Sequence, residues 1–376
     1  MSKSYYSLGL MSGTSMDGVD ASIIRSDGKA QYIAILDNYF QYPKDIFQDL
    51  TKLRDKIKSS KELKKFEKQI KFIEKEITLF HAKAVNKILK KLKVNVDFIG
   101  FHGQTIFHSA KEKISKQLGD GDLLSKHTKK TVIYNFRQND LKNDGQGAPL
   151  TPIFHKLVQN QYKLKSPLYI LNIGGIANVT CIDKNDFMYS TDIGPGNCLI
   201  DQWIRLNSKR KYDKDGKIAS TGKINKIILN KALEYFDDKD GPKSYDVKDF
   251  YLPSFRGLSL EDGAATLTEY TSEIINQSLE KLSLKMAETS EYNIVISGGG
   301  RKNKFLIKNI EKKINVKGAF KKSLKLIDDF GIDGDFVESQ AFAYLAIRSY
   351  LNLPISFPET TGVREPCNGG TIVKNF

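Results

Sequence analysis

Short apolar runs separated by a glycine-containing polar segment open the chain. Tyr5–Met11 and Val19–Ile24 are the apolar runs, and Gly13 and Gly18 lie in the segment between them. Runs of this length, bounded by turn residues, predict two β-strands joined by a tight turn.

The same pattern returns in the second half of the chain. Leu168–Ile173 and Ile176–Ile182 flank the pair Gly174 and Gly175, and Leu171 matches Leu8 at an offset of 171 − 8 = 163 residues. Solenoid repeats have much shorter periods, so this offset predicts a duplicated fold.

Apolar residues at helical spacing fill the segments between the strands. From Pro43 to Leu92 they recur every three or four residues with lysine and glutamate between them, which predicts a long core-facing helix and a preceding partner helix. The same reasoning predicts helices at Ile153–Tyr162, Asn197–Leu206, Leu260–Leu284 and Glu338–Leu351, and strands at Val94–Phe101, Thr131–Asn135, Met188–Thr191 and Tyr292–Ile296. Alternating strands and helices predict an α/β fold.

The length of 376 residues favours two domains over one core. Lys163–Pro167 has the composition of a linker, so we place the domains at 1–165 and 166–376.

Composition argues against a membrane protein and against a metal centre. No apolar run approaches the ~18–20 residues of a membrane span, and the N-terminus does not resemble a signal peptide. The cysteines Cys181, Cys198 and Cys367 are odd in number and lack metal-type spacing, and no histidine pair forms a zinc motif. Reduced thiols in the cytoplasm are the simplest interpretation.

The net charge of +15 raises the alternative of nucleic-acid binding. The lysines are scattered, however, and interleave with glutamate and with helical apolar positions. We therefore favour a solvated lysine-rich surface without a nucleic-acid partner. A basic field would still attract anionic substrates.

The first glycine turn has the composition of an anion-binding site. Gly13 and Gly18 would let backbone N–H groups approach an anion closely. Thr14 and Ser15 add hydroxyl donors to this segment. The carboxylate of Asp17 or Asp20 could hold a metal through water. An ordinary hairpin with polar turn residues remains the alternative.

Two acidic residues lie beside predicted strand and helix ends. Asp192 precedes the segment Gly194-Pro195-Gly196 and is a candidate general base, with a helix-capping or turn-forming role as the alternative. Glu338 begins an apolar helix, where a carboxylate also interacts favourably with the helix dipole.

A second group of polar residues follows predicted strands. Gln104 and Thr105 beside His102 could form a hydrogen-bonding wall for a substrate, although His102 could instead be a core histidine. Arg137 could clamp a carboxylate or pair with Asp140.

Later in the chain, Gly298, Gly299 and Gly300 precede Arg301 and Asn303 and could accept an adenine or a ribose. A strand-to-helix turn is the alternative for this segment.

Together these motifs resemble the anhydro-N-acetylmuramic acid kinase family of bacterial cell-wall recycling. The matching segments are GLMSGTSMDGVDA (9–21), GFHGQTIFH (100–108), FRQND (136–140), DGQGAPLTPIFH (144–155), LNIGGIANVT (171–180), DIGPGNCLIDQW (192–203), SGGGRKN (297–303), ESQAFAYLAIR (338–348) and TTGV (360–363). They occur in order along nearly the whole chain, so their combination is specific.

The resemblance implies a two-domain, actin-like (ribonuclease-H-like) α/β fold that closes over an interdomain cleft. Whether the C-terminal segment packs back on the first domain is left open. It also implies the reaction: water opens the 1,6-anhydro ring of the sugar substrate while ATP, with Mg²⁺, phosphorylates the freed hydroxyl.

The resemblance further implies the roles of single residues. Asp192 would be the general base, Glu338 an acidic group beside it, and no metal ligand is assigned. The sugar would meet His102, Gln104, Thr105 and Arg137. ATP would bind at Gly13, Thr14, Ser15, Met16, Asp17, Gly18, Val19, Asp20, Gly174, Gly175, Gly298, Gly299, Gly300 and Asn303.

Two rival functions remain open at this point. One is an actin-like kinase for another sugar, and the other is a non-metabolic actin-like ATPase. Whether the chain forms a homodimer is also left open.

Overall fold

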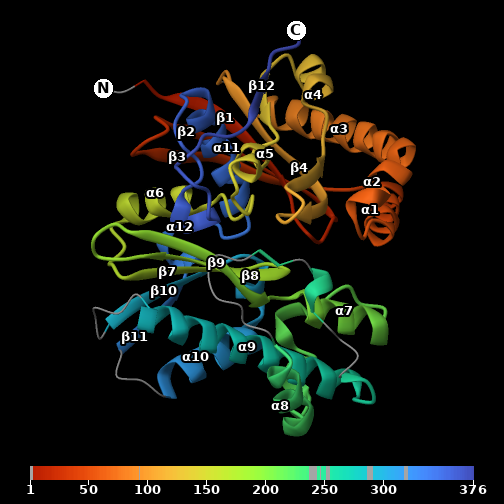
Figure 1. Cartoon of the computed structure of the whole chain (residues 1–376), viewed down its shortest axis with the longest axis vertical. Helices are drawn as coiled ribbons and strands as arrows, with labels where there is room; N and C mark the ends of the chain where they lie inside the picture. The colour runs from red at the N-terminus through yellow and green to blue at the C-terminus, as the bar shows by residue number, and fades with distance from the viewer. Residues whose placement is uncertain are drawn as a thin grey trace. The chain divides into compact units, whose positions relative to one another are not determined.

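Two mixed β-sheets with helices on their faces form the protein, as the computed structural model in Figure 1 shows. The structure describes residues 3–92, 94–236, 244–245, 247–250, 255–285, 291–316 and 321–376. The chain divides into two compact units, Met1–Lys163 with Phe336–Phe376, and Leu164–Asp335. From the sequence, the expected domain boundary lies between residues 165 and 166, whereas the two units divide after Lys163. The segment from Phe336 onward belongs to the first unit.

The sheet of the first unit has the strand order β12-β6-β4-β1-β2-β3, with β5 paired to β4. β1, β2 and β3 are antiparallel neighbours, whereas β4 runs parallel to both β1 and β6. The strands are β1 (Tyr5–Ser12), β2 (Gly18–Ser26), β3 (Tyr32–Gln41), β4 (Phe98–Ser109), β5 (Ile114–Leu118), β6 (Thr131–Tyr134) and β12 (Thr371–Val373).

The sheet of the second unit repeats this arrangement in the order β11-β10-β7-β8-β9. β7, β8 and β9 are antiparallel neighbours, and β10 runs parallel to β7 and β11. The strands are β7 (Leu168–Ile173), β8 (Ile176–Ile182), β9 (Met188–Pro195), β10 (Glu291–Ser297) and β11 (Lys321–Leu326). The order and directions of β6-β4-β1-β2-β3 in the first sheet recur as β11-β10-β7-β8-β9 in the second, which confirms the predicted α/β class and its duplication.

The helices follow the strands in each unit. The first unit contains α1 (Lys44–Lys56), α2 (Ser60–Lys65), α3 (Glu67–Leu89), α4 (Gly121–Thr128), α5 (Gln138–Lys142), α6 (Pro152–Tyr162), α11 (Val337–Tyr350) and α12 (Pro358–Thr361). The second contains α7 (Cys198–Asn207), α8 (Lys226–Glu234), α9 (Leu260–Lys285) and α10 (Lys304–Val316). Short 3₁₀ turns are η1 (Lys214–Gly216), η2 (Ala219–Thr221), η3 (Val247–Asp249), η5 (Gly299–Lys302) and η6 (Ile327–Phe330).

Helices cover the first sheet because their apolar positions fall on one side. The predicted stripe of α3, including Ile73, Ile77 and Ile88, is buried in one core with β1 and β2. α11 packs against β1, β2 and β4 and is buried along nearly its whole length. The predicted long helix and its preceding partner are thus confirmed as α3 and α1.

Strand lengths differ from the prediction in two places that carry candidate site residues. β4 runs on to Ser109 because β5 pairs with its second half, so His102 to Thr105 lie inside the strand rather than after its end. β9 runs on to Pro195 because it pairs with β8 over that length. Asp192 therefore lies within a strand, and the helix-capping alternative for it is wrong.

Four strands were not predicted from the pattern, namely β3, β5, β11 and β12, and two of them show why. β3 has mixed burial and a register shift opposite Ile23 and Ile24, and β11 contains three lysines. Both have the edge position in their sheets, where one side of the strand is not buried by a neighbour and the apolar alternation weakens.

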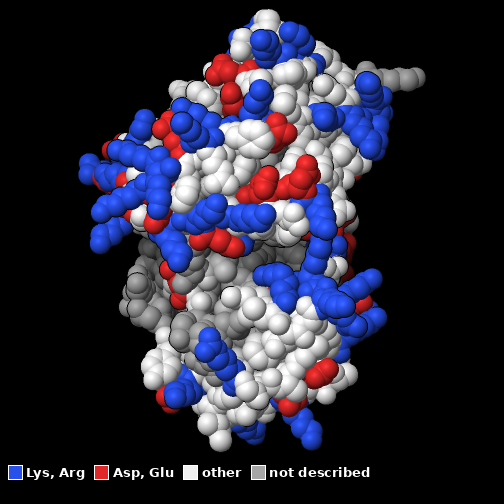
Figure 2. All heavy atoms as spheres, turned by 90° about the vertical axis from the view of Figure 1, so that its right-hand side faces the viewer, with Lys and Arg blue, Asp and Glu red and all other residues white. Residues whose placement is uncertain are grey.

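Lysines gather on the surface of the first unit. Figure 2 shows many Lys and Arg side chains on the face that carries α1, α2 and α3, with Asp and Glu between them. Lys68, Lys71 and Lys75 of α3 are exposed there, and Lys71 pairs with Glu67 one helical turn earlier. Both signs of charge therefore share this face.

Candidate active site

The turn between β1 and β2 is fixed by hydrogen bonds at both ends. The Met16 amide donates to the Gly13 carbonyl at 3.2 Å. The Asp17 carbonyl accepts from the Tyr42 amide at 2.8 Å and from the Tyr39 hydroxyl at 3.0 Å. Met16 has a φ of 57°, a left-handed conformation that helps the chain reverse. These hydrogen bonds therefore hold the backbone of this candidate phosphate turn in one conformation.

The side chains of this turn divide into exposed and buried ones. Thr14 and Ser15 are exposed, whereas Met16 and Val19 are buried in the core, so only the backbone of the latter two could face a ligand. A Cβ built on Gly13 would have no atom within 4 Å, which leaves its backbone approachable.

Packing against β3 explains the second glycine of the turn. A Cβ on Gly18 would lie 2.5 Å from the Phe40 carbonyl oxygen and from the Tyr39 hydroxyl.

Burial, followed by the charges of Asp17 and Asp20, raises the pKa of Tyr39 well above its usual range, so its hydroxyl stays a donor.

A buried chain of hydrogen bonds supports the turn from beneath. The Ser12 hydroxyl lies 2.9 Å from the Tyr42 hydroxyl and 3.3 Å from His81 Nε2, and His81 Nδ1 lies 2.7 Å from the Ile77 carbonyl oxygen. Because the carbonyl can only accept, Nδ1 carries the proton and Nε2 accepts. Burial lowers the pKa of His81 to about 4 and keeps it neutral. No motif predicted this network, since His81 lies in the ordinary helical pattern of α3.

Gln104 connects β4 to the same turn. Its Nε2 donates to the Gly13 carbonyl at 3.0 Å, which fixes the orientation of the amide, because a carbonyl cannot donate. Its Oε1 is buried and has no partner within the described part of the chain. The neighbouring Thr105 hydroxyl accepts from Gln117 at 3.2 Å. Gln104 is thus anchored by its nitrogen and offers an unused acceptor.

A bulge in β4 sets the direction of these side chains. Leu10 of β1 pairs with Phe101, but Ser12 pairs with Gln104, so β4 has one extra residue between the pairs. Gly103 lies in this irregularity with a φ of 75°. Bulges redirect side chains and recur beside active sites.

His102 and Arg137 form a directed pair in the first unit. Arg137 Nη2 lies 2.9 Å and Nε 3.3 Å from His102 Nε2, and Nη1 donates to the Gly147 carbonyl at 2.8 Å. His102 Nδ1 lies 2.7 Å from the Gly103 carbonyl oxygen. Burial, with the charge of Arg137, holds the pKa of His102 well below its usual range. His102 is therefore a neutral acceptor that orients the guanidinium.

Asp140 is engaged elsewhere. It accepts from the Gly147 amide at 2.6 Å and from the Thr361 hydroxyl, and it thereby ties the 144–149 loop to the start of α5.

Glu338 joins this group from the first turn of α11. Burial raises the pKa of its carboxyl, and the positive charge of Arg137 opposes that rise. A bond of 2.6 Å between the hydroxyls of Ser339 and Ser22 ties the helix start to β2. The fold therefore brings Glu338 into electrostatic contact with Arg137, about 200 residues away in sequence.

Two glycines allow α11 to approach the sheet this closely. A Cβ on Gly9 would lie 1.9 Å from the Ser339 carbonyl oxygen, and one on Gly100 would lie 2.2 Å from the Phe342 carbonyl oxygen. Both glycines belong to the motifs singled out from the sequence, so part of their role is to seat the helix that carries Glu338.

Asp192 is buried in the second unit, within β9. Its Oδ2 accepts a 2.7 Å hydrogen bond from the Tyr245 amide. The helix α7 begins after Asn197, five residues further on.

The turn between β7 and β8 is tied to the start of α7. The Gly174 carbonyl accepts from the Asn197 amide at 2.8 Å, and the Gly175 carbonyl accepts from the amides of Gly196 and Cys198 at 2.9 and 3.1 Å. A Cβ on Gly196 would lie 2.3 Å from the Gly174 carbonyl oxygen, so this contact requires glycine.

The third glycine segment begins η5 and leads into α10. Gly298 has a φ of 79°, and a Cβ there would lie 2.7 Å from the Ile173 carbonyl oxygen, whereas Gly299 has no atom within 4 Å of such a position. Asn303 Oδ1 accepts from the Leu306 amide at 3.0 Å and thus caps α10. Asn303 Oδ1 therefore caps the helix of a strand-to-helix turn, which was the alternative considered for this segment.

The structure therefore gathers the candidates into two sets, each within one unit. The first unit holds the β1–β2 turn with His102, Gln104, Arg137 and Glu338, and the second holds Asp192 with the turns at Gly174 and Gly298. Among the described residues, no group of three or more His, Cys, Asp or Glu side chains is arranged to hold a metal ion. The described helices include none that is both long and apolar enough to cross a membrane.

The solved structures to which this chain is similar include distant neighbours. The activator of 2-hydroxyisocaproyl-CoA dehydratase from Clostridium difficile aligns with a TM-score of 0.41 at 11% identity, covering 91% of this chain and 94% of that chain. A hexokinase from Schistosoma mansoni aligns with a TM-score of 0.42 at 12% identity, covering 91% and 85%.

Sequence comparison is far more specific. The family model for anhydro-N-acetylmuramic acid kinase matches residues 5–375. A protein of that name from Pelagibacter ubique is 54% identical over 380 residues, covering 100% of both chains. Proteins of the same name from Zymomonas mobilis and Agrobacterium fabrum are 38% and 36% identical, covering 97% and 98% of this chain and 98% of each relative. The chain therefore belongs to the anhydro-N-acetylmuramic acid kinase family.

Proposed function

We propose that this protein uses water and ATP to convert 1,6-anhydro-N-acetylmuramic acid into N-acetylmuramate 6-phosphate and ADP, as a step of peptidoglycan recycling. Family membership along the full chain supports the reaction. A cytoplasmic location follows from the use of ATP and agrees with three unpaired cysteines.

The observation that carries the proposal is the convergence of His102, Arg137 and Glu338. They come from β4, the start of α5 and the start of α11, and they form a pair of hydrogen bonds and a charge contact. Structural stability alone does not call for a half-buried carboxyl beside a guanidinium whose orientation is fixed by a neutral histidine. Such perturbed groups are typical of functional sites.

Arg137 would bind the carboxylate of the substrate. A guanidinium matches a carboxylate in geometry and charge, and His102 and the Gly147 carbonyl hold it in one orientation. Gln104 Oε1 is buried and has no partner among the described residues. It would accept a hydrogen bond from a substrate N–H or O–H, since a buried acceptor left unpaired is costly.

The residues present fit ATP at the glycine turns. Gly13 and Gly299 each leave open space where a side chain would otherwise stand, which lets backbone N–H groups approach phosphate or ribose. Mg²⁺ bound with ATP would neutralise phosphate charge. The ion would have few protein ligands, because Mg²⁺ usually keeps waters and phosphate oxygens as ligands. Asp17 or Asp20 would contact it through a bound water.

Asp192 would act as the general base. It takes a proton from water as the water oxygen bonds to the anomeric carbon, and the bond from that carbon to the bridging oxygen breaks. The freed O6 takes the γ-phosphoryl group, and ADP leaves. The Tyr245 amide holds Asp192 Oδ2 for this step. Glu338, whose pKa is raised, is the acidic group proposed beside the reacting atoms.

A homodimer is a further part of the proposal. The edge strand β3 has Ile33, Ile35 and Tyr39 exposed by 49%, 38% and 44%, and its ten residues include no Lys, Arg or Pro, which commonly protect sheet edges. A second copy could pair there. Light scattering should give twice the chain mass, and Ile33→Lys with Ile35→Lys should reduce it to one chain mass; a monomeric wild type would refute this part.

One reaction tests the proposed function. The purified protein is incubated with ATP, Mg²⁺ and anhydro-N-acetylmuramic acid, and ADP and sugar products are measured by mass spectrometry. We expect ADP and the 6-phosphate in equal amounts, and no ADP release with N-acetylglucosamine or glucose. Turnover of those sugars without turnover of the anhydro sugar would assign the chain to another substrate.

A further inference from the structure

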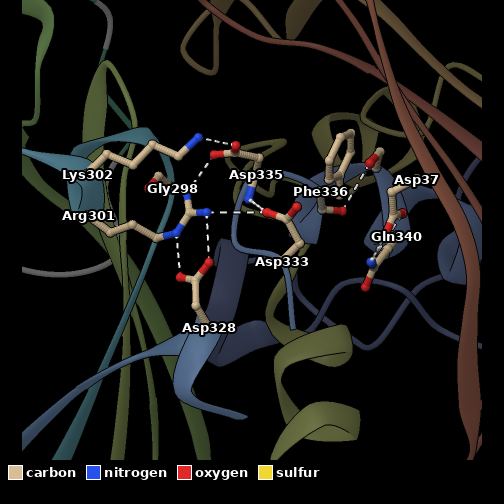
Figure 3. A network of polar contacts seen from close by, with 10 residues as sticks. Asp37, Gly298, Arg301, Lys302, Asp328, Asp333, Asp335, Phe336 and Gln340 are labelled. Atoms are coloured by element: carbon tan, nitrogen blue, oxygen red, sulfur yellow. Dashed lines mark hydrogen bonds and ion pairs between the residues drawn. The ribbon is translucent and has the colours of Figure 1, made fainter. Parts of the chain in front are cut away.

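The guanidinium of Arg301 uses all five of its N–H groups within the second unit, as Figure 3 shows. Nε donates to Asp328 at 2.6 Å, and Nη2 donates to Asp328 at 3.0 Å and to Asp333 at 3.3 Å. Nη1 donates to Asp335 at 2.6 Å and to the Gly298 carbonyl at 3.1 Å. Arginine has five donors, so none remains for a ligand.

This side chain is buried beside an open depression. Arg301 is only 4% exposed, although it lines a hollow of about 410 Å³. The other lining residues are Lys302, Asp328, Gly331, Ile332, Asp333 and Asp335. A Cβ on Gly334 would lie 2.4 Å from Nε and 2.7 Å from Cζ of Arg301. The backbone of the following segment thus packs directly on the guanidinium.

The charges around Arg301 make its removal consequential. Hydrogen bonds from Arg301 lower the pKa of Asp328. Burial alone would raise the pKa of Asp335, but hydrogen bonds from Arg301 and Lys302 outweigh it and lower the pKa. Without the guanidinium, three carboxylates would remain close together with Lys302 as the nearby cation, and like charges repel.

The clamped segment leads directly into α11. Asp335 is the last residue of the second unit, and the carbonyl of Phe336 accepts from the Gln340 amide at 2.9 Å. Within the first unit, Gln340 Nε2 donates to Asp37 at 3.1 Å, as Figure 3 also shows. Glu338 is three residues beyond Asp335, so the chain is fixed on both sides of this carboxyl.

We propose that Arg301 is a positioning residue that ties the segment Asp328–Asp335 to the Gly298–Gly300 turn and thereby links nucleotide binding at this turn to the order of the first turn of α11. The roles of the turn and of Glu338 rest on the proposed function; the clamp itself rests on the contacts above. Arg301 acts through its neighbours and touches no substrate.

Hydrogen exchange of the full-length protein tests the clamp without any activity measurement. Arg301→Lys keeps one positive charge but cannot supply five fixed donors. We expect exchange at the amides of Asp335 and Gln340 to rise at least tenfold, with β4 and β10 unchanged. Lys302→Met, which removes only an exposed partner of Asp335, should change these amides less than twofold. Unchanged exchange in Arg301→Lys, or an equal rise throughout the protein, would overturn the proposal.

A second arm adds a non-hydrolysable ATP analogue. In the wild type, we expect slower exchange at residues 298–303 and also at 337–341, whereas Arg301→Lys should keep only the first effect. Protection at 298–303 alone in the wild type would overturn the link. If residues 298–303 are not protected at all, the nucleotide assignment fails, and the first comparison still decides the clamp.

Kinetics separate positioning from nucleotide contact. Arg301→Lys should lower kcat about tenfold or more while KM for ATP changes less than threefold, and in a Glu338→Gln background the same change should have little further effect. A rise in KM for ATP at constant kcat would instead make Arg301 a nucleotide contact and would contradict the proposal.

Discussion

Arg137 Nη2 lies 2.9 Å from His102 Nε2, so a residue that is always protonated fixes the protonation of its neighbour. Since Arg137 can only donate, His102 must accept at Nε2 and carry its proton at Nδ1, where the Gly103 carbonyl lies 2.7 Å away. His102 is therefore suited to orient Arg137 and unsuited to act as a proton donor at Nε2.

The first prediction concerns this pair. His102→Phe removes the acceptor and should let the guanidinium swing, which costs about 1.5–3 kcal/mol, the typical value of a charged hydrogen bond. KM for the sugar should rise by about 10- to 100-fold, and KM for ATP should stay within about twofold. His102→Gln, which retains an acceptor, should recover part of the loss. Equal effects of both variants on ATP and sugar would contradict the assignment to the sugar site.

The second prediction concerns Asp192. Asp192→Asn keeps an oxygen for the Tyr245 amide but removes the base, so kcat should fall by about 10²–10⁴-fold while both substrates still bind. Ring opening and ADP release should be lost together, as mass spectrometry can determine. Asp183→Asn, at an exposed turn of the same unit, is the control and should keep full turnover. Accumulation of opened but unphosphorylated sugar would show that the two steps are separable.

The third prediction distinguishes two glycines of one motif. Gly9→Ala places a methyl group 1.9 Å from a carbonyl of α11 and should reduce the free energy of unfolding by about 1–3 kcal/mol or more, with loss of activity. The Cβ of Gly13→Val would have no atom within 4 Å, so the melting temperature should remain near that of the wild type while ATP affinity falls at least tenfold. Calorimetry measures both quantities. Native affinity in Gly13→Val would remove this turn from the nucleotide site.

The fourth prediction concerns acid stability. Burial lowers the pKa of His81 and of His155 from 6.5 to about 4, so between these values the unfolded chain binds protons that the folded protein does not. The contribution of these histidines to the free energy of unfolding should therefore be fully present above pH 6.5. It should fall as the pH drops toward 4, by up to about 3 kcal/mol per histidine. Denaturant unfolding at pH 7, 6, 5 and 4.5 measures this loss.

A substitution checks the cause of that pH dependence. His81→Gln removes one titrating group and should make the loss shallower, while His127→Gln, at the exposed end of α4, should leave it unchanged. A pH dependence that is identical in all three proteins would show that His81 does not contribute.

The sequence by itself determined the elements whose period is strong. Leu168–Ile173 and Ile176–Ile182 are strands with the predicted bounds, and α3 has the predicted apolar stripe, because local side-chain alternation decides these elements. The 163-residue echo correctly indicated duplication, since equal strand–turn–strand units recur in both sheets.

Only the tertiary structure decided how far some strands extend and which side chains meet. β4 and β9 continue past their apolar cores because β5 and β8 provide hydrogen-bonding partners, which the local pattern cannot reveal. His81 beneath the first turn, Arg137 beside Glu338 and the four bonds from Arg301 to carboxylates all join residues separated by tens to hundreds of positions. Such contacts depend on loop closure and packing. The spacing of apolar residues along the chain carries no information about which side chains meet across the fold.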